Sequence, residues 1–257
     1  MPPFVKRRKP ALPGSIPDVL GMFHAEVRFY REIAPVVGVR VPACYRAADD
    51  DSGTLLELED LSAWSPGADP GAAARLLSGL HRRWAGEAPE RWPWLRPLGA
   101  GVDLVEQLFI RTWPGLARRG DLPPEVASFG ARMAEPGQVT AAEQAIAGAG
   151  PLTLVHGDAQ ACNMRTGPGG EIALLDWEDV SAAPGILDLA WLLTASVAPG
   201  RWAETLAAYG PSVHLDLVLP AVMVQGLFMV SDMRSARRTH ALSQAASAKP
   251  CDDSSNP

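Results

Sequence analysis

The spacing of apolar and polar positions divides the chain into a short mixed part and a longer, mainly helical part. Residues 4–6 have the pattern of a strand end, and residues 22–37 carry apolar side chains at helical spacing, with Pro35 as the expected end. Residues 41–61 contain two strand-like runs around a turn at residues 51–53. These elements predict a small region of strands and one helix.

A stretch rich in proline and glycine follows this region. Residues 62–71, SAWSPGADPG, have the composition of a linker or hinge. Two short strands at residues 151–158 and 171–179 interrupt the rest of the chain, and we expect them to form a hairpin. The remaining periodic segments predict helices at residues 72–86, 101–120, 123–135, 140–149 and 186–197.

The predicted organisation is a small region at residues 1–61, a mainly helical region at 62–242 and a disordered tail at 243–257. The tail is polar and rich in small residues, which is typical of disorder. The apolar run at residues 215–230 is too short and too interrupted for a membrane span. We expect a buried helix there that starts near Pro220.

Composition narrows the class of protein. Hydrophobic residues make up 47% of the chain and charged residues 20%, which is typical of a soluble globular protein. The formal net charge of -6 argues against broad nucleic-acid binding and mildly favours cationic partners. The three cysteines show no disulfide or metal-site spacing, and the N-terminus has no signal-peptide pattern. We therefore expect a cytoplasmic protein without a membrane partner; the sequence does not indicate an oligomeric state.

The residues best suited to catalysis or metal binding lie in LVHGDAQACNMR and ALLDWEDV. Asp158 and Asn163 share a loop that leaves a predicted strand, and Asp176 ends the next strand. Two carboxylates and an amide at the mouth of one hairpin offer a base and oxygen ligands, which Mg²⁺-dependent phosphoryl transfer requires. Each residue alone has a simpler explanation, because a loop Asp is usually a turn or cap residue and His156 could simply orient the loop. The occurrence of His156, Asp158, Asn163 and Asp176 together favours a catalytic role over these separate structural ones.

A metal-dependent hydrolase is the weaker interpretation of these residues. His156, Asp158 and Asp176 could hold its metal, but zinc sites usually need several histidines close together, and the five histidines are widely spaced. The G-x-S-x-G sequence of a nucleophile elbow is also missing.

Taken together, HGDAQACN, LLDWEDV and GILDLAWLL resemble the aminoglycoside phosphotransferase and choline kinase-like family. The resemblance implies an α+β, protein-kinase-like fold with a small β-containing N-lobe and a larger, mainly helical C-lobe. It implies that Asp158 is the catalytic base and that His156 braces its loop. It also makes Asn163 and Asp176 the Mg²⁺ ligands and gives Asp188 a supporting role beneath the loop.

The N-terminal part extends this resemblance. AEVRFYREIA is similar to the small-lobe helix of the family, in which Glu26 would pair with Lys6 and hold it against the ATP phosphates. LLELEDL resembles the hinge strand, so the backbone at Glu57, Leu58 and Glu59 would meet the adenine. Without the other motifs, these charges would be interpreted as a surface pair and as exposed residues at a strand end.

The chain departs from the family at its beginning. The family's small lobe has two strands and a phosphate-covering loop before the lysine strand, whereas Lys6 is almost the first residue here. We therefore expect a truncated small lobe with an exposed sheet edge and no roof over the phosphates. Gln160 stands where the family often has His, at a position outside the core catalytic set.

The predicted function is ATP- and Mg²⁺-dependent transfer of the γ-phosphate to a small-molecule hydroxyl. The acceptor would be aminoglycoside-, choline- or sugar-like, with cationic molecules among the candidates. The alternative is a truncated kinase-like protein that binds nucleotide or ligand with weak or no catalysis. Side chains that could select an acceptor, or simply form core and surface, are Trp84, Trp92, Trp94, Trp113, Glu87, Glu90, Asp103 and Glu106.

Overall fold

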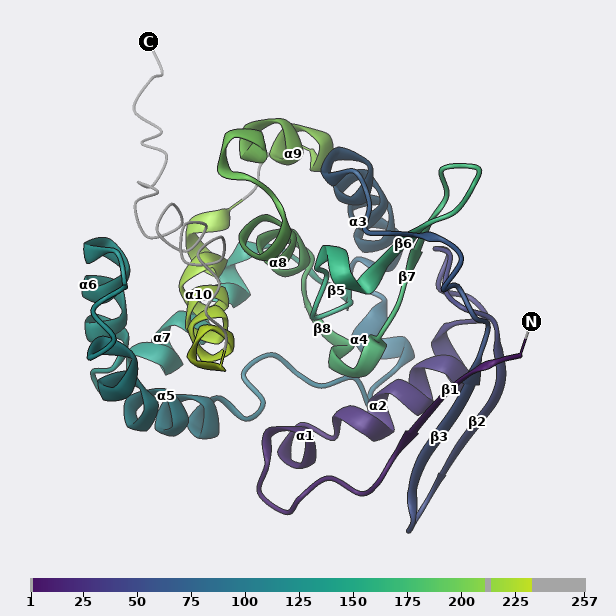
Figure 1. The fold of residues 1–257 in the computed structure, drawn as a ribbon, viewed down its shortest axis with the longest axis horizontal. Helices are drawn as coiled ribbons and strands as arrows, with labels where there is room; N and C mark the ends of the chain where they lie inside the picture. The colour runs from purple at the N-terminus through teal and green to yellow at the C-terminus, as the bar shows by residue number, and fades with distance from the viewer. Residues whose placement is uncertain (1, 211–213, 233–257) are drawn as a thin grey trace.

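The structure, a computed structural model, describes residues 2–210 and 214–232 (Figure 1). A small region surrounds one three-stranded sheet, and a larger region is mainly helical, so the expected α+β class is confirmed. The predicted tail at 243–257 and the end of the predicted region at 62–242 lie outside the described residues.

The strands of the described residues are short, and all eight belong to three small sheets. They are β1 (Phe4–Arg8), β2 (Cys44–Asp50), β3 (Gly53–Leu58), β4 (Ser65–Pro66), β5 (Leu152–Val155), β6 (Met164–Thr166), β7 (Ile172–Leu174) and β8 (Ser181–Pro184).

Helices account for most of the remaining chain. The α-helices are α1 (Ile16–Val19), α2 (Met22–Arg28), α3 (Pro70–Trp84), α4 (Ala88–Arg91), α5 (Val102–Ala117), α6 (Pro124–Met133), α7 (Gln138–Ala145), α8 (Ile186–Ser196), α9 (Trp202–Tyr209) and α10 (Leu215–Asp232). Shorter helical turns are η1 (Phe29–Ile33), η2 (Ile146–Ala149), η3 (Ala161–Asn163), η4 (Trp177–Asp179) and η5 (Pro199–Arg201).

The small region is an antiparallel sheet with the strand order β1-β3-β2, covered by α2. The predicted turn is confirmed, because β2 ends at Asp50 and β3 begins at Gly53. Strand β1 pairs with β3 so that Lys6 lies opposite Leu56. Lys6 thus lies on an edge strand of the sheet, and its Nζ reaches Asp176 of the larger region at 2.5 Å.

The predicted helix at residues 22–37 is shorter than expected and changes character. It ends at Ile33, and its last five residues form the wider π-helical turn η1. This turn buries Phe29 completely, whereas Phe23 of α2 is only half-buried. The Phe29 ring stacks on Trp177 of η4 at 4.0 Å, so the π turn contributes to the contact between the two regions.

The larger region is built around α8 and α10, which pack against each other. Helix α3 packs on α8 and α9, and α7 packs on α10. Helix α10 begins at Leu215 rather than near Pro220, so Pro220 lies inside the helix. The packing of α10 against α7 and α8 outweighs the hydrogen bond and the steric fit that this proline costs. Within the described residues, no helix combines the length and apolar character needed to cross a membrane.

The predicted hairpin of two strands is wrong. Strand β5 pairs with β8, whereas β7 pairs with β6 in a separate sheet of order β4-β6-β7. Strands as short as β6 and β8 show too little alternation to be recognised in the sequence. Strand β4 lies inside the predicted linker at residues 62–71, so part of that stretch belongs to a sheet.

A matched pair of glycines tests the helical packing. A Cβ atom at Gly130 in α6 would lie 2.1 Å from the Trp113 ring, whereas one at Gly79 in α3 would meet nothing within 4 Å. We expect Gly130→Ala to lower the free energy of unfolding by about 1–3 kcal/mol. Gly79→Ala should raise it by about 0.5–1 kcal/mol, since alanine favours the helix. Urea denaturation measures both, and similar effects would contradict this packing.

Candidate active site

Strand β5 leads directly into the loop that carries His156, Gly157 and Asp158. Gly157 has a φ of +86°, and a Cβ atom there would lie 2.3 Å from the backbone oxygen of Asp179. Only glycine fits this combination of backbone angle and close approach. The loop is therefore pressed against η4, which brings the two sequence motifs together.

The carboxylate of Asp188 holds this loop from below. It is fully buried and accepts hydrogen bonds from the backbone N–H groups of His156 (2.8 Å) and Gly157 (2.9 Å). Its Oδ2 is also 3.0 Å from Nε2 of His81, whose Nδ1 is 2.8 Å from the Tyr209 hydroxyl. Burial alone would raise the pKa of Asp188, but the His81 ring and the loop N–H groups hold it below its usual range. The structure thus places Asp188 where it can support the loop.

His156 joins the two motifs through its ring. Nε2 donates to the Leu175 carbonyl at 2.7 Å, and Nδ1 accepts from the Asp158 N–H at 3.2 Å. The ring also lies against Trp177, with centroids 4.6 Å apart. Both ring nitrogens are engaged within the protein, so the geometry favours a bracing role for His156 over proton transfer.

Amide groups orient the Asp158 carboxylate. Asn163 Nδ2 donates to Oδ2 at 2.7 Å and to the Asp158 backbone oxygen at 2.9 Å. Gln160 Nε2 lies 2.7 and 2.9 Å from the two carboxylate oxygens. Gln160 was not expected to take part in the catalytic site, yet the structure places it in direct contact with Asp158. Its position two residues away in the same loop was the available signal.

Backbone pairing brings Asn163 and Asp176 together. The Leu175 N–H donates to the Asn163 carbonyl at 2.9 Å, next to the β6–β7 ladder. Asp176 then adopts a left-handed conformation with φ 61°, and its side chain is 38% exposed. Asn163 Nδ2 is directed to Asp158. Among the residues that the structure describes, Asn163 Oδ1 accepts only from the weak Cys162 thiol, at 3.5 Å. An amide oxygen and an accessible carboxylate form a donor set that suits Mg²⁺.

Lys6 lies among three carboxylates. Its Nζ is 2.7 Å from Glu26, 2.5 Å from Asp176 and 3.4 Å from Glu178. The structure thus brings together the Lys6, Glu26 and Asp176 that the sequence selected. It adds Glu178, which also pairs with Arg8 at 2.6 Å and which the sequence analysis missed.

Burial and neighbouring charges both shift the pKa values in this cluster. Burial would lower the pKa of Lys6, but the charge of Glu26 and the hydrogen bond to Asp176 outweigh it and raise that pKa. Burial raises the pKa of Glu26 to about 7, although Lys6 opposes the shift. Burial also raises the pKa of Glu178, and the neighbouring Asp176 adds to this effect.

The residues selected for the adenine hinge make contacts of their own. Glu57 and Leu58 lie in the central strand β3, between β1 and β2. Glu59 follows the strand, and both of its carboxylate oxygens lie 2.6 Å from Arg40 Nη2. Glu59 is thus a paired residue rather than a free charge, and nucleotide binding by these three residues stays a prediction.

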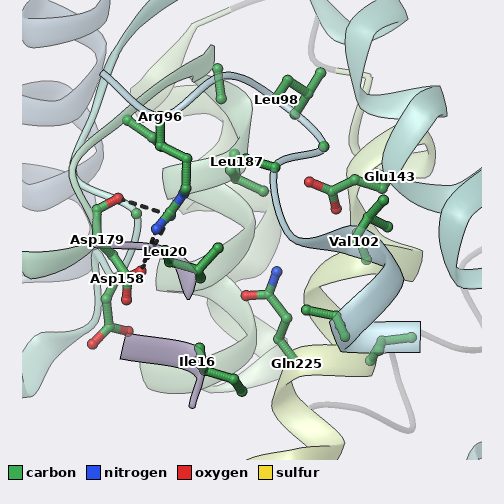
Figure 2. A pocket seen from close by; sticks show the side chains of 18 of the residues that line it. Ile16, Leu20, Arg96, Leu98, Val102, Glu143, Asp158, Asp179, Leu187 and Gln225 are labelled. Carbon is green, nitrogen blue, oxygen red and sulfur yellow. Dashed lines mark hydrogen bonds and ion pairs between the residues drawn. The ribbon is translucent and has the colours of Figure 1, made fainter. Parts of the chain in front are cut away.

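A cavity of about 620 Å³ opens beside Asp158 (Figure 2). Most of its lining is apolar and comes from helices α1, α5, α7, α8 and α10 and from the segment before α5. Near Asp158, its wall includes Arg96 paired with Asp179 at 3.2 Å. These residues lie far apart in the sequence, so no local pattern could have indicated them.

The acceptor-selecting residues suggested by the sequence lie elsewhere. Trp84, Trp92 and Trp113 are buried in the core. Glu106 caps the start of α7 by accepting hydrogen bonds from the backbone N–H groups of Gly137 and Thr140. The tryptophan that lines the cavity is instead Trp191 of α8.

Comparison with known proteins gives one matching family and several similar structures. The model of a family described as "Phosphotransferase enzyme family" matches residues 5–214. A search of curated protein sequences found no match. An aminoglycoside phosphotransferase, APH(3'')-Id from Streptomyces rimosus, solved with ADP and streptomycin, has a similar structure. Its TM-score is 0.60 at 18% identity, covering 87% of this chain and 86% of that one.

Two choline kinases are also similar in structure. The enzyme LicA from Streptococcus pneumoniae has a TM-score of 0.53 at 18% identity, covering 87% of this chain and 81% of its own. The enzyme from Cryptosporidium parvum has a TM-score of 0.56 at 11% identity, covering 95% and 80%. These similarities show that the chain has a protein-kinase-like fold.

The buried carboxylate beneath the loop gives a first prediction for the site. Asp188→Asn replaces one acceptor oxygen by a donor that faces other donors. We expect the free energy of unfolding to fall by about 3 kcal/mol or more. Asp69→Asn is the control, because Asn caps α3 as well as Asp does and the exposed ion pair with Arg201 that is lost contributes little. Equal effects of the two variants in urea denaturation would contradict the role of Asp188.

The raised pKa of Glu26 gives a pH prediction. Folded Glu26 keeps a proton that unfolded Glu26 releases as the pH rises from 4.5 to about 7, so the folded state loses stability across this window. Relative to Glu26→Gln, the wild type should lose about 3 kcal/mol of unfolding free energy between these pH values and little more above them. Urea denaturation of both proteins across the window measures the difference. A difference that stays constant with pH would refute the assignment.

Proposed function

This chain belongs to the phosphotransferase enzyme family, and we propose that it transfers the γ-phosphate of ATP to a hydroxyl group of a small molecule. The observation that carries the proposal is the convergence of Asp158, Asn163 and Asp176 from two motifs, with Asp158 lining a cavity. In this proposal, residues 1–61 form the N-lobe and the C-lobe begins at residue 62.

Asp158 is the proposed catalytic base. Its carboxylate lines the cavity and is oriented by the amides of Gln160 and Asn163. An acceptor hydroxyl within hydrogen-bond distance of this carboxylate could donate its proton as it attacks the phosphate. His156 and Asp188 fix the loop, so that Asp158 keeps its position without being reoriented at the moment of reaction.

Asn163 and Asp176 are the residues proposed to hold Mg²⁺. The amide Oδ1 and the partly exposed carboxylate are hard oxygen donors of the kind this ion prefers. Bound Mg²⁺ would supply neutralisation of the negative charge on the phosphates. The protein's own part is to hold the two donors at the ends of neighbouring segments through the Leu175–Asn163 backbone hydrogen bond.

Lys6 is the residue proposed to contact the ATP phosphates. Its ammonium is held by Glu26 from α2 and by Asp176 from the larger region, so it lies at the junction between the two regions. A positive charge fixed beside a metal-binding carboxylate is the arrangement that positions phosphates in kinase-type transfer. Glu57, Leu58 and Glu59 complete the proposal as the adenine-facing part of the hinge.

Two substitutions separate the proposed roles. Asp158→Asn should lower kcat by about a hundredfold to ten-thousandfold while leaving the affinity for Mg²⁺-ATP nearly unchanged, because it removes only the base. Asp176→Asn should weaken Mg²⁺-ATP binding itself, since it removes a metal ligand. Calorimetry measures binding, and ATP consumption with a panel of hydroxylated amines measures turnover.

The exposed Asp103→Asn variant is the control and should behave like the wild type. Wild-type turnover in Asp158→Asn would remove the proposed base. A wild-type protein that neither binds Mg²⁺-ATP nor consumes it with any acceptor would overturn the proposed function.

A further inference from the structure

The charges around the cavity are not equally available to a ligand. Asp179 is paired with Arg96, and Glu178 with Arg8. Glu143 of α7 also lines the cavity, but it forms no ion pair in the part of the chain that the structure describes. Apart from the proposed base Asp158, Glu143 is therefore the cavity carboxylate whose charge has no close counterpart.

Glu143 is directed into the cavity from the side opposite Asp158. Figure 2 shows the two carboxylates on opposite sides of the space, with Leu187 between them in this view. Burial raises the pKa of Glu143, and the Gly99 N–H and the more distant charge of Arg96 offset this only in part. A cation bound beside Glu143 would offset the cost of burying this carboxylate, which the protein's own groups offset only weakly.

Much of the remaining lining is apolar. It includes Leu20, Leu98, Val102, Leu187 and Trp191, and its charged groups near Asp158 are already paired. The amide of Gln225 also reaches the cavity and offers one neutral hydrogen-bonding group. A ligand with several charged groups would have to leave some of them against these walls, which is unfavourable. A ligand with one charge and an apolar body would match both the walls and Glu143.

We propose that the cavity selects alcohols that have an apolar body and a single cationic group, with the cation at Glu143 and the hydroxyl at Asp158. This inference rests on the proposed function for the position of the hydroxyl, whereas the preference for one cation rests on the cavity alone. It separates this chain from a phosphotransferase whose acceptor is a highly charged polyamine sugar.

Three probes test the preference. They are an N,N-dimethylamino alcohol with an octyl chain, its neutral isostere in which CH replaces the nitrogen, and the polycation streptomycin. With the full chain, calorimetry should show about tenfold tighter binding of the amine than of the isostere or of streptomycin. Failure to bind the amine, or binding of either other probe as tightly, would overturn the inference.

Substitutions then assign the preference to Glu143. Glu143→Gln keeps an acceptor for the Gly99 N–H and should reduce the amine-to-isostere ratio to within about twofold. Glu90→Gln, which changes an exposed glutamate outside the cavity lining, should leave the ratio unchanged. Val102→Phe fills the cavity without changing its charge and should weaken both probes alike. A ratio that persists in Glu143→Gln would refute the assignment.

The same samples distinguish the two proposals. Product detection by mass spectrometry, with Mg²⁺-ATP present, shows whether the bound amine is phosphorylated. Selective binding without phosphoryl transfer would overturn the proposed function and support the cavity assignment. Phosphoryl transfer without any preference for the amine would support the proposed function and overturn the cavity assignment.

Discussion

The buried carboxylate of Asp188 connects the Asp158 loop to the helical core. An isolated carboxylate in such a place would be strongly destabilising, because burial removes its hydration. Here the donors come from the loop after β5 and from His81 on α3, and Tyr209 on α9 in turn contacts His81. The groups that stabilise the Asp188 charge therefore depend both on the loop conformation and on the packing of these helices. A change in any one of the elements alters the environment of the loop.

A second electrostatic arrangement connects the small and large regions. Lys6 comes from β1 and Glu26 from α2, whereas Asp176 and Glu178 follow β7. The stacked rings of Phe29 and Trp177 lie across the same junction. Charge and aromatic packing thus fix the two regions to each other at the point where the proposed nucleotide and metal groups meet. The geometry of this junction depends on both halves of the chain.

The sequence could predict the features that are local. Asp158 and Asn163 share one loop, and the turn between β2 and β3 has its own composition signal. It could not predict the pairing of β5 with β8, because three- and four-residue strands carry almost no periodicity. Nor could it identify Glu143 as a cavity residue, since helical spacing does not say which polar residue of α7 faces a hollow. The tryptophans show the same limit, because composition alone cannot separate core from binding wall.

Apart from Asp158, which belongs to both sets, the groups proposed for phosphoryl transfer and those expected to select the acceptor lie on different elements. The former follow β5 and β7 and are tied to Asp188, whereas Glu143, Val102 and Gln225 lie on α7, α5 and α10. Helix-borne side chains at the cavity can change one at a time without disturbing the hydrogen bonds of the loop. In evolutionary terms, this chain can drift in acceptor preference through single substitutions while its reaction chemistry is conserved. Neighbouring lineages with the same loop sequence should therefore not be assumed to share a substrate.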